Sequence, residues 1–364
     1  MEKQTLLSPY TLGNIGLKNR MVMAPMTRSR SNNEGNVATK LTAEYYAQRA
    51  TAGLQISEGS FISRQAVGFI NVPGIYSNEQ VEGWKLVTEA VHKEGGKIFA
   101  QLWHTGRMSH PALHNGELPH APSAINPHVQ AFTDQGFVDT VTPKEMTIED
   151  IRQTIQDFKN AAANAIKAGF DGVELHAANG YLLHQFFVGA SNQRTDEYGG
   201  SIENRARILF ETLDALKGVI DLSKVGVRFN PSSHNVFGMQ VDDLTIPTFE
   251  YIIRRLNNYG MAYIHLTEPF TDVSNVPFAV KEVAKHFRPL YNGTLIINNG
   301  FNKETATKII EDGNADLVAF GVPFIANPDL VKRFQIDAPL NIPDQNTFYT
   351  TGTIGYIDYP ALTA

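Results

Sequence analysis

Cysteine is absent from the 364-residue chain. Its absence excludes disulfides, thiolate metal sites, thiol nucleophiles and cysteine-bound iron–sulfur clusters. It also fits a reducing compartment, so a cytoplasmic location is expected. Long apolar runs are absent too: no stretch of about 18 apolar residues occurs, which predicts that nothing spans a membrane. The first nine residues contain the acid Glu2 and lack the apolar segment of a secretory signal.

An excess of positive charge is also lacking. The chain has 31 Lys and Arg residues against 37 Asp and Glu residues, a formal net charge of -6. This balance offers no basic face for nucleic acid. With 42% hydrophobic residues, the chain has enough apolar material for a large core. The expected partner is a small molecule, not a nucleic acid or a membrane, and the expected state is a monomer or a homodimer.

Several chemical motifs are missing. The chain has no Gly-x-Gly-x-x-Gly dinucleotide turn, no P-loop and no Gly-x-Ser-x-Gly elbow. A His-x-x-x-His pattern occurs at His110 and His114, but Pro111 argues against a helix that presents both rings. No metal site is therefore predicted.

What is present is an alternation of short strands, rich in Val, Ile and Leu, with helical segments. The predicted strands cover residues 19–24, 54–57, 97–102, 172–175, 224–229, 263–267, 294–298 and 315–320. The predicted helices cover residues 42–52, 78–94, 147–168, 201–219, 248–259, 276–287, 303–311 and 328–334. Thr42 and Asn78 are expected to cap the first two helices.

Two segments lie outside this alternation. Residues 6–17 predict a small N-terminal β-hairpin. Residues 105–143 lose any period, and a structureless loop of that length is unusual in a compact domain. We expect a small excursion there, with a hairpin near residues 132–141, that covers one mouth of the fold.

Eight repeats of strand and helix predict parallel βα units. With no break in composition, they favour a single domain over residues 1–364, folded as a closed (β/α)8 TIM barrel of the α/β class. The alternative is an open doubly wound sheet, which usually carries a glycine-rich dinucleotide turn after its first strand. That turn is missing, so the barrel is favoured.

Active sites of such barrels lie at the carboxyl ends of the strands. Polar groups and glycines gather there in this chain. The strand-end residues are Pro25, Met26, Thr27, Gly59, Gln101, Trp103, His176, Asn179, Tyr181, Arg228, Asn298, Asn299, Gly300 and Gly321.

These residues suit a large, flat, partly polar ligand that carries a phosphate. The loops after the last two strands, at Asn299–Gly300 and Gly321–Val322, are the usual phosphate site of the fold. Arg228 offers a fixed positive charge beside an electron-accepting ring. Gln101 can both donate and accept, as a pyrimidine-like edge requires. Thr27 can donate to a ring atom.

The stretch Gly172-Val-Glu-Leu-His-Ala-Ala-Asn-Gly-Tyr181 sets three polar side chains after a buried strand. Taken alone, it fits equally well a strand end whose polar groups satisfy nearby backbone and a ligand site. Its place as the fourth strand of a barrel favours the site.

Taken together, the motifs resemble the old yellow enzyme family of flavin-dependent ene-reductases. The matching segments are Met23-Ala-Pro-Met-Thr-Arg28, Gln101-Leu-Trp-His-Thr-Gly-Arg107, residues 172–186, residues 194–205, Val225-Gly-Val-Arg228, residues 326–330, Thr347-Phe-Tyr349 and residues 355–360. They span almost the whole chain in the expected order. They are most similar to the branch that holds N-ethylmaleimide, pentaerythritol tetranitrate and 12-oxophytodienoate reductases.

The resemblance implies a barrel that holds FMN without a covalent bond and takes electrons from NADPH or NADH in a ping-pong cycle. Flavin N5 would deliver hydride to the β-carbon of an activated alkene, such as an unsaturated ketone or aldehyde, a maleimide or a nitroalkene. His176 and Asn179 would donate to the substrate oxygen, and Tyr181 would give the proton to the α-carbon. The implied cofactor contacts are Pro25, Met26, Thr27, Gly59, Gln101, His176, Arg228, Asn299, Gly300, Gly321 and Val322. The implied walls of the substrate cavity are Phe69, Trp103 and Tyr349.

Two positions depart from the family pattern. Members commonly carry an Arg after the glycine of the last strand, on the phosphate, whereas this chain has Val322. Weaker and more salt-dependent FMN binding is therefore expected. The pair His176 and Asn179 replaces the His/His pair of some members, and both pairs occur in the family.

Two alternative functions can be set against this one. A (β/α)8 aldolase or isomerase would need a catalytic Lys or a pair of carboxylates at the strand ends, and the sequence shows neither there. The other is an FMN-binding barrel with a different role, either nitroester reduction or a non-catalytic stress or binding protein.

Overall fold

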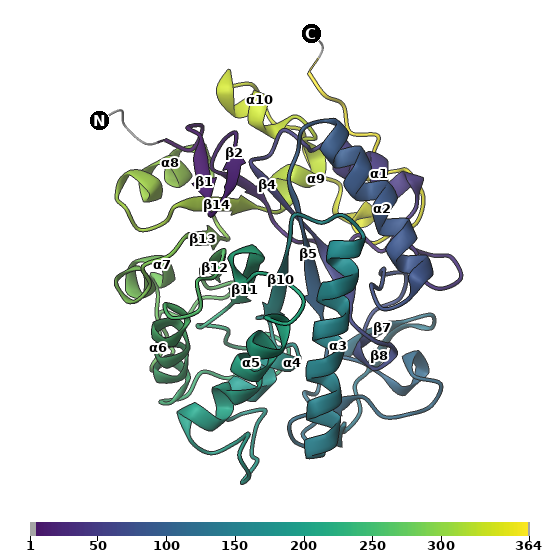
Figure 1. Ribbon diagram of the computed structural model, residues 1–364, viewed down its shortest axis with the longest axis vertical. Helices are drawn as coiled ribbons and strands as arrows, with labels where there is room; N and C mark the ends of the chain where they lie inside the picture. Colours follow the sequence, from purple (N-terminus) through teal and green to yellow (C-terminus); the bar gives the residue numbers. More distant parts are fainter. Residues whose placement is uncertain (1–4, 363–364) are drawn as a thin grey trace.

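The computed structural model describes residues 5–362, and within them eight parallel strands close into one barrel. Around the barrel the strands follow the order β10, β11, β12, β13, β14, β3, β4, β5 (Figure 1). The strands are β3 (Met21–Met23), β4 (Leu54–Phe61), β5 (Ile98–Trp103), β10 (Gly172–Ala177), β11 (Val225–Phe229), β12 (Tyr263–Thr267), β13 (Leu295–Asn298) and β14 (Leu317–Phe320). The predicted (β/α)8 barrel is confirmed.

Helices surround the barrel. They are α1 (Lys40–Ala47), α2 (Asn78–Lys93), α3 (Ile148–Lys167), α4 (Leu182–Phe187), α5 (Ile202–Leu216), α6 (Thr245–Leu256), α7 (Val283–Phe287), α8 (Lys303–Glu311), α9 (Val322–Ala326) and α10 (Leu330–Gln335). Short 3₁₀ turns occur at Arg64–Ala66, Pro111–Leu113, Leu222–Lys224, Arg288–Leu290 and Gln345–Thr347. Helix α3 begins as predicted, because Thr147 and Asp150 cap each other's backbone N–H groups.

The N-terminal hairpin, β1 (Tyr10–Leu12) and β2 (Ile15–Leu17), closes the amino end of the barrel. Its Leu12 and Leu17 pack into a cluster that we call the barrel floor. The floor consists of Leu12, Leu17, Val22, Leu54, Ile56, Phe99, Ile296 and Leu317, all nearly inaccessible to solvent. The predicted hairpin is thus confirmed, and it helps to shield the floor from solvent.

The excursion after β5 is also as predicted. A hairpin of β7 (Gln130–Thr133) and β8 (Gly136–Asp139) stands there, and two short strands, β6 (His120–Ala121) and β9 (Lys144–Glu145), tie its base together. Phe132 bridges to Phe69 in the loop after β4. The excursion therefore meets the loops at the carboxyl ends of the strands.

Some predicted boundaries are wrong. The helix expected over residues 276–287 shrinks to α7, because Pro277 cannot donate a helical hydrogen bond and Phe278 has a positive φ of 66°. Thr39 and Ser77, not Thr42 and Asn78, cap α1 and α2. Strand β4 continues through Phe61, so Gly59 lies inside the strand and not after it.

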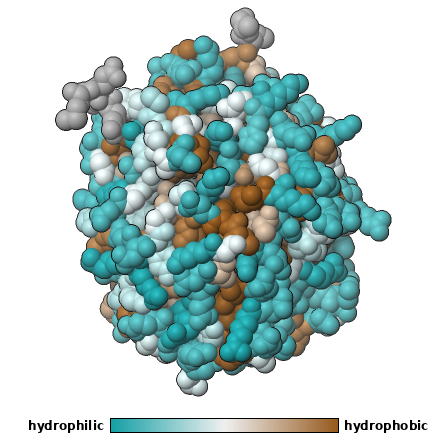
Figure 2. Space-filling model, in the orientation of Figure 1, coloured by the Kyte–Doolittle hydropathy of each residue, from teal (hydrophilic) through white to brown (hydrophobic). Residues whose placement is uncertain are grey.

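Hydrophilic residues cover most of the face seen in Figure 2, with an apolar strip near its middle. Between residues 5 and 362, none of the helices combines the length and the apolar character that crossing a bilayer would require.

Candidate active site

The barrel interior changes from apolar to polar along its axis. Above the floor stands a group that we call the mouth layer: Gln101, Glu174, His176, Arg228, His265 and Asn298, with exposed fractions between 0% and 8%. Strand register explains the grouping. His176 on β10 lies beside Arg228 on β11, which lies beside His265 on β12. Inward-facing residues recur every second position along a strand, so neighbouring strands build a continuous polar layer.

The turn after β10 fixes the three polar residues singled out from the sequence. Asn179 and Gly180 both adopt positive φ, 56° and 77°. The Gly180 N–H donates to Nδ1 of His184 at 3.0 Å, and its carbonyl accepts from Gln185 at 2.7 Å. Both partners belong to α4, which the sequence prediction missed. The helix thus holds the turn rigidly and directs Tyr181 toward the mouth.

His176 is a neutral donor. Burial, followed by the positive charge of Arg228, lowers the pKa of His176 well below its usual value. Its Nδ1 is buried and has no hydrogen-bond partner among the described residues. A buried polar atom without a partner is costly unless a ligand satisfies it.

Asn179 is oriented by a neighbour. The side-chain amide of Asn230 donates to the Asn179 carbonyl oxygen at 3.2 Å. That bond leaves the NH₂ group of Asn179 as the free end of its amide. Two neutral donors, one from an imidazole and one from an amide, therefore lie at the carboxyl end of the same strand.

Tyr181 stands among aromatic rings. Its ring meets Trp103 edge-on at 4.9 Å, His176 at 4.9 Å and Phe69 at 6.4 Å. Burial, reinforced by Tyr349 and opposed by Arg228, raises the pKa of Tyr181 above its usual value. The phenol therefore keeps its proton at neutral pH.

These rings wall a cavity of about 450 Å³ at the carboxyl end of the barrel. Its lining residues are Thr27, Ser29, Phe69, Trp103, Gln130, Phe132, Phe137, Tyr181, Phe237, Gln345, Asn346, Tyr349 and Thr350. Five of the predicted site residues thus meet in one cavity: Thr27, Phe69, Trp103, Tyr181 and Tyr349. Gly59 stands behind it, where a Cβ would lie only 2.5 Å from the Trp103 ring. Glycine at this position lets the indole lie flat against β4.

The C-terminal segment that carries Tyr349 is held by buried arginines. Arg30 donates to the carbonyls of Thr347 and Phe348, both at 2.8 Å, and Arg28 donates to the carbonyl of Gly355 at 2.8 Å. Arg28 directly follows Thr27. The segment therefore closes over the loop after β3 although more than 300 residues separate them in the chain.

Arg228 is the buried cation of the mouth layer. One of its Nη atoms donates to Asn298 Oδ1 at 3.1 Å, whereas its Nε has no partner among the described residues. Burial lowers the pKa of Arg228, and the negative charge of Glu174 opposes that shift. Gln101 donates from Nε2 to Glu174 at 2.8 Å. Glu174 is not among the site residues predicted from the sequence, although it precedes His176 by two positions and so shares its inward face.

The residues predicted for a phosphate lie apart from the aromatic cavity. Asn299 and Gly300, with φ of 80° and 82°, line a second cavity of about 640 Å³. Gly321 lies beside Met26, since a Cβ on Gly321 would contact the Met26 sulfur at 3.4 Å. Val322 begins α9, is 44% exposed and lines neither cavity.

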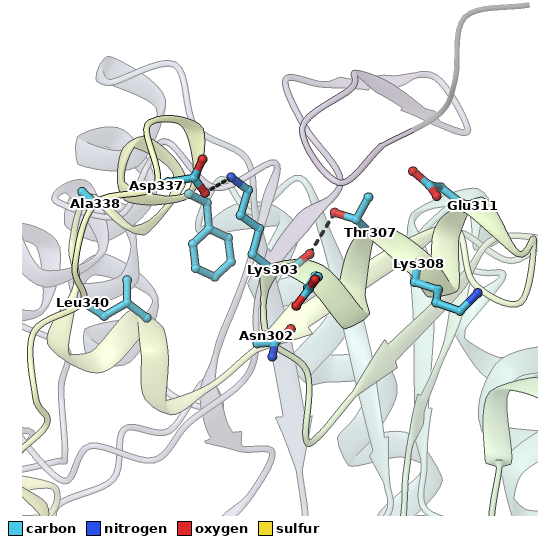
Figure 3. Close-up of a pocket in the computed structure, with 10 residues that line it drawn as sticks. Asn302, Lys303, Thr307, Lys308, Glu311, Asp337, Ala338 and Leu340 are labelled. Atoms are coloured by element: carbon cyan, nitrogen blue, oxygen red, sulfur yellow. Dashed lines mark hydrogen bonds and ion pairs between the residues drawn. The ribbon is translucent and has the colours of Figure 1, made fainter.

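A larger hollow of about 730 Å³ lies on the outer surface, between α8 and the end of α10 (Figure 3). None of the predicted site residues lines it. Both of its lysines are engaged with neighbours: Lys303 points toward Asp337 and bonds to it, and Lys308 pairs with Asp312. We therefore place the site in the barrel mouth and not in this hollow.

The sequence missed the far wall of the cavity, built by Phe132, Phe137 and Phe237. No local signal marks Phe132 or Phe137, because the excursion has no period. Phe237 has a φ of 49°, unusual for a bulky residue, and its ring lies 5.7 Å from that of Tyr181. Only the folded chain brings these rings together.

The donor set fits a flavin. Unpartnered buried groups at His176 Nδ1, Arg228 Nε and the Trp103 indole face one interior, beside an amide that can donate and accept. Within residues 5–362 no cluster of three or more His, Asp or Glu side chains could hold a metal ion. Fold and site together define a cofactor-dependent oxidoreductase barrel.

Comparisons with known proteins identify the family within this class. Residues 5–341 match the model of the NADH:flavin oxidoreductase / NADH oxidase family. The chain is 43% identical over 363 residues to 12-oxophytodienoate reductase 1 of Oryza sativa subsp. japonica, covering 98% of this chain and 93% of that protein.

Solved structures agree. Morphinone reductase superposes with a TM-score of 0.94 at 41% identity, covering 99% of this chain and 97% of that one. The old yellow enzyme homologue from Zymomonas mobilis superposes with a TM-score of 0.93 at 39% identity, covering 98% and 100%. The chain belongs to the old yellow enzyme family of FMN-dependent NAD(P)H oxidoreductases.

Proposed function

We propose that this NAD(P)H-linked flavin ene-reductase reduces the activated C=C bond of small unsaturated ketones, aldehydes, maleimides and nitroalkenes. The observation that carries the proposal is the packing of His176 against Trp103 and Tyr181, which both line the aromatic cavity, with Asn179 two residues before Tyr181. The relatives are named for reducing 12-oxophytodienoate and morphinone, which supports a small-molecule substrate.

In this proposal His176 and Asn179 bind the carbonyl or nitro oxygen of the substrate. Negative charge grows on that oxygen as the alkene is reduced. Two preset neutral donors stabilise the charge where it develops, and they act strongly in a site that excludes water. His176 suits the role because its lowered pKa keeps the ring neutral. The ring then donates a hydrogen bond to the substrate oxygen without protonating it before the C=C bond is reduced.

Tyr181 supplies the proton to the α-carbon. Its raised pKa keeps the phenol protonated across the neutral range, so a proton is available for transfer to the substrate. Trp103, Phe69 and Tyr349 hold the alkene between them and keep bulk water from protonating the wrong face. After transfer, the tyrosinate is a strong base that regains its proton from solvent.

When bound, FMN would supply the hydride to the β-carbon and would take its electrons from NAD(P)H. The residues proposed to hold it are Pro25, Met26, Thr27, Gly59, Gln101, His176, Arg228, Asn299, Gly300, Gly321 and Val322. Arg228 would bring a buried positive charge to the pyrimidine end, and Gln101 would bring one donor and one acceptor. The backbone at Asn299–Gly300 and Gly321–Val322 would hold the phosphate.

The rival aldolase or isomerase chemistry lacks its groups. Among the described residues that line the aromatic cavity, none is a lysine or a carboxylate. Glu58 and Glu174 are buried in strands, but each is bonded to other protein groups, Glu58 to the Arg28 N–H and Glu174 to Gln101 and His265.

The proposal is tested by spectroscopy. The purified protein should show a yellow flavin spectrum that bleaches with NADPH or NADH under anaerobic conditions and returns on adding 2-cyclohexenone. Return of the oxidised spectrum only with a nitroester would favour nitroester reduction instead. A flavin spectrum that bleaches but responds to no alkene would refute the proposed substrate class.

A further inference from the structure

A carboxylate and an amide face each other inside the barrel, just below the mouth. Glu174 on β10 and Gln101 on β5 are partners in the parallel register, and Gln101 Nε2 lies 2.8 Å from Glu174 Oε1. Their exposed fractions are 0% and 2%. Neither solvent nor a surface rotamer can therefore replace this contact.

The carboxylate decides which end of the amide faces it. An ionised carboxylate only accepts hydrogen bonds, so the Gln101 NH₂ must point at Glu174 and the Gln101 carbonyl oxygen must point away. Burial alone would raise the pKa of Glu174, but His265, Arg228 and Gln101 together lower it. Glu174 is thus ionised although it is fully buried.

Glu174 is itself fixed from the other side. Its second oxygen, Oε2, lies 2.9 Å from Nδ1 of His265 on β12. Burial lowers the pKa of His265 despite the nearby carboxylate, so the ring is neutral and donates its Nδ1 proton. With both oxygens engaged across three strands, Glu174 cannot swing away from Gln101.

We propose that Glu174 is a positioning residue that sets the hydrogen-bonding polarity of Gln101 toward the pyrimidine edge of FMN. Gln101 is left with one acceptor, its carbonyl oxygen, and one remaining N–H donor. An imide edge, in which an N–H lies beside a carbonyl, is the complement of that pair. The inference rests on the role proposed for Gln101.

The same carboxylate also counterbalances Arg228. Negative charge from Glu174 partly cancels the guanidinium charge inside the barrel, where screening by water is weak. Replacing the carboxylate with a neutral group leaves more uncompensated positive charge beside the flavin. Reduced flavin, which carries more negative charge than the oxidised form, then gains stability.

The decisive experiment compares FMN with 3-methyl-FMN, in which a methyl group replaces the imide proton. The wild-type protein should bind FMN more tightly by roughly 10- to 100-fold, because the methyl group leaves a buried acceptor unpaired. In Glu174→Gln the facing amide can itself donate, so the side-chain amide of Gln101 is free to rotate and exchange its NH₂ and carbonyl ends. The preference for FMN should then fall to roughly a few-fold.

The flavin reduction potential gives a second readout, which a merely structural role would not move in a set direction. Glu174→Gln should shift the potential upward. A tenfold gain in binding of reduced over oxidised FMN corresponds to about 30 mV for a two-electron couple. Glu174→Asp keeps the charge but is one methylene shorter, so it should lose part of the preference for FMN and keep the wild-type potential.

Glu58→Gln is the matched control. Glu58 is also a buried strand carboxylate, 1% exposed, but it accepts from the Arg28 N–H and does not contact Gln101. This variant should keep the wild-type FMN preference and potential. An equal loss of preference in Glu58→Gln would overturn the proposal.

Three further results would overturn it as well. The first is a folded Glu174→Gln protein that keeps the wild-type preference for FMN over 3-methyl-FMN; if that variant does not fold, the same result in folded Glu174→Asp takes its place as the second. The third is a wild-type protein that binds both flavins equally. Alkene reduction by the wild-type protein is measured separately. The proposed function can therefore fail or stand independently of this result.

Discussion

The floor and the mouth layer are two halves of one barrel interior, built on the same strands, yet they are chemically opposite. The floor is aliphatic and aromatic and is plugged by the N-terminal hairpin. The mouth layer buries a guanidinium, a carboxylate, two imidazoles and two amides. Several of its polar atoms, among them His176 Nδ1 and Arg228 Nε, have no partner in the described part of the chain.

The difference shows where the fold is stabilised and where it is used. Packed apolar side chains need no ligand to be satisfied. Buried polar groups without partners cost stability, and a protein keeps them where a ligand will complete them. The floor therefore stabilises the fold, whereas the mouth layer lowers its stability and provides a preset binding site.

The largest expected effect separates the mouth's chemistry from its binding. Tyr181→Phe removes the proton donor and little else, so alkene reduction should slow by roughly 10²- to 10⁴-fold. Flavin reduction by NAD(P)H should be unchanged, which stopped-flow measurement of the two half-reactions would show. Tyr198→Phe is the control, because the Tyr198 hydroxyl donates to Glu211 outside the cavity. Equal alkene turnover in Tyr181→Phe would remove Tyr181 from the mechanism.

The second effect tests the floor. Leu54 is fully buried, and Leu54→Ala should lower the free energy of unfolding by about 2–5 kcal/mol because a cavity replaces its side chain. The folded fraction should bind FMN with wild-type affinity, since Leu54 lies below the mouth layer. Urea unfolding and flavin titration measure the two quantities. A large loss of FMN affinity in folded protein would show that floor and mouth are not separable.

The third effect is a pH dependence of the free energy of unfolding. It arises outside the floor, because the floor as defined holds no ionisable side chain. Burial lowers the pKa of His104 and His184 to about 3 and that of His114 to about 4. In the unfolded chain these rings take up protons near pH 6.5, so stability is lost as the pH falls below that value. Glu58 acts in the opposite direction, since burial raises its pKa to about 7 and its folded form binds a proton first.

The histidines held neutral by burial, which also include His176, outnumber the one carboxyl with a raised pKa, so the unfolded state binds more protons than the folded state. The free energy of unfolding should therefore fall between pH 6 and pH 5, by about 1.4 kcal/mol for each extra proton. Urea unfolding at the two pH values measures it. Glu58→Gln should steepen the loss by about 1.4 kcal/mol per pH unit. Stability that stays constant or rises on acidification would contradict the neutral burial of these rings.

The smallest effect concerns the rim. Val322→Arg places a cation where the chain has an exposed apolar residue, and an exposed charge contributes about 0.2–1 kcal/mol. FMN should bind up to roughly fivefold more tightly at low salt, and the gain should shrink as salt is added. Val322→Met is the neutral control. Unchanged FMN affinity in Val322→Arg would mean that the phosphate does not lie near this position.

A feature of the fold or site could be predicted from the sequence where neighbouring residues carried its signal. Residues at strand ends, such as His176 and Arg228, were found because the barrel gathers all strand ends at one rim. Glu174 lies inside its strand and not at the strand end, so the strand-end rule does not select it, although the two-residue period places it on the same face as His176. The predicted start of the helix over residues 276–287 was wrong, because the apolar pattern continues across Pro277, which breaks a helix.

The sequence by itself determined the eightfold alternation of strand and helix, the hairpin under the barrel and the motifs of the family, because each is written in neighbouring residues. Tertiary structure decided the rest. It brought Tyr349 over Thr27 through Arg28 and Arg30, and it set Phe237 beside Tyr181. It also made His176 neutral and Glu174 charged, because a pKa shift depends on burial and on charges from other strands, which exist only once the barrel has closed.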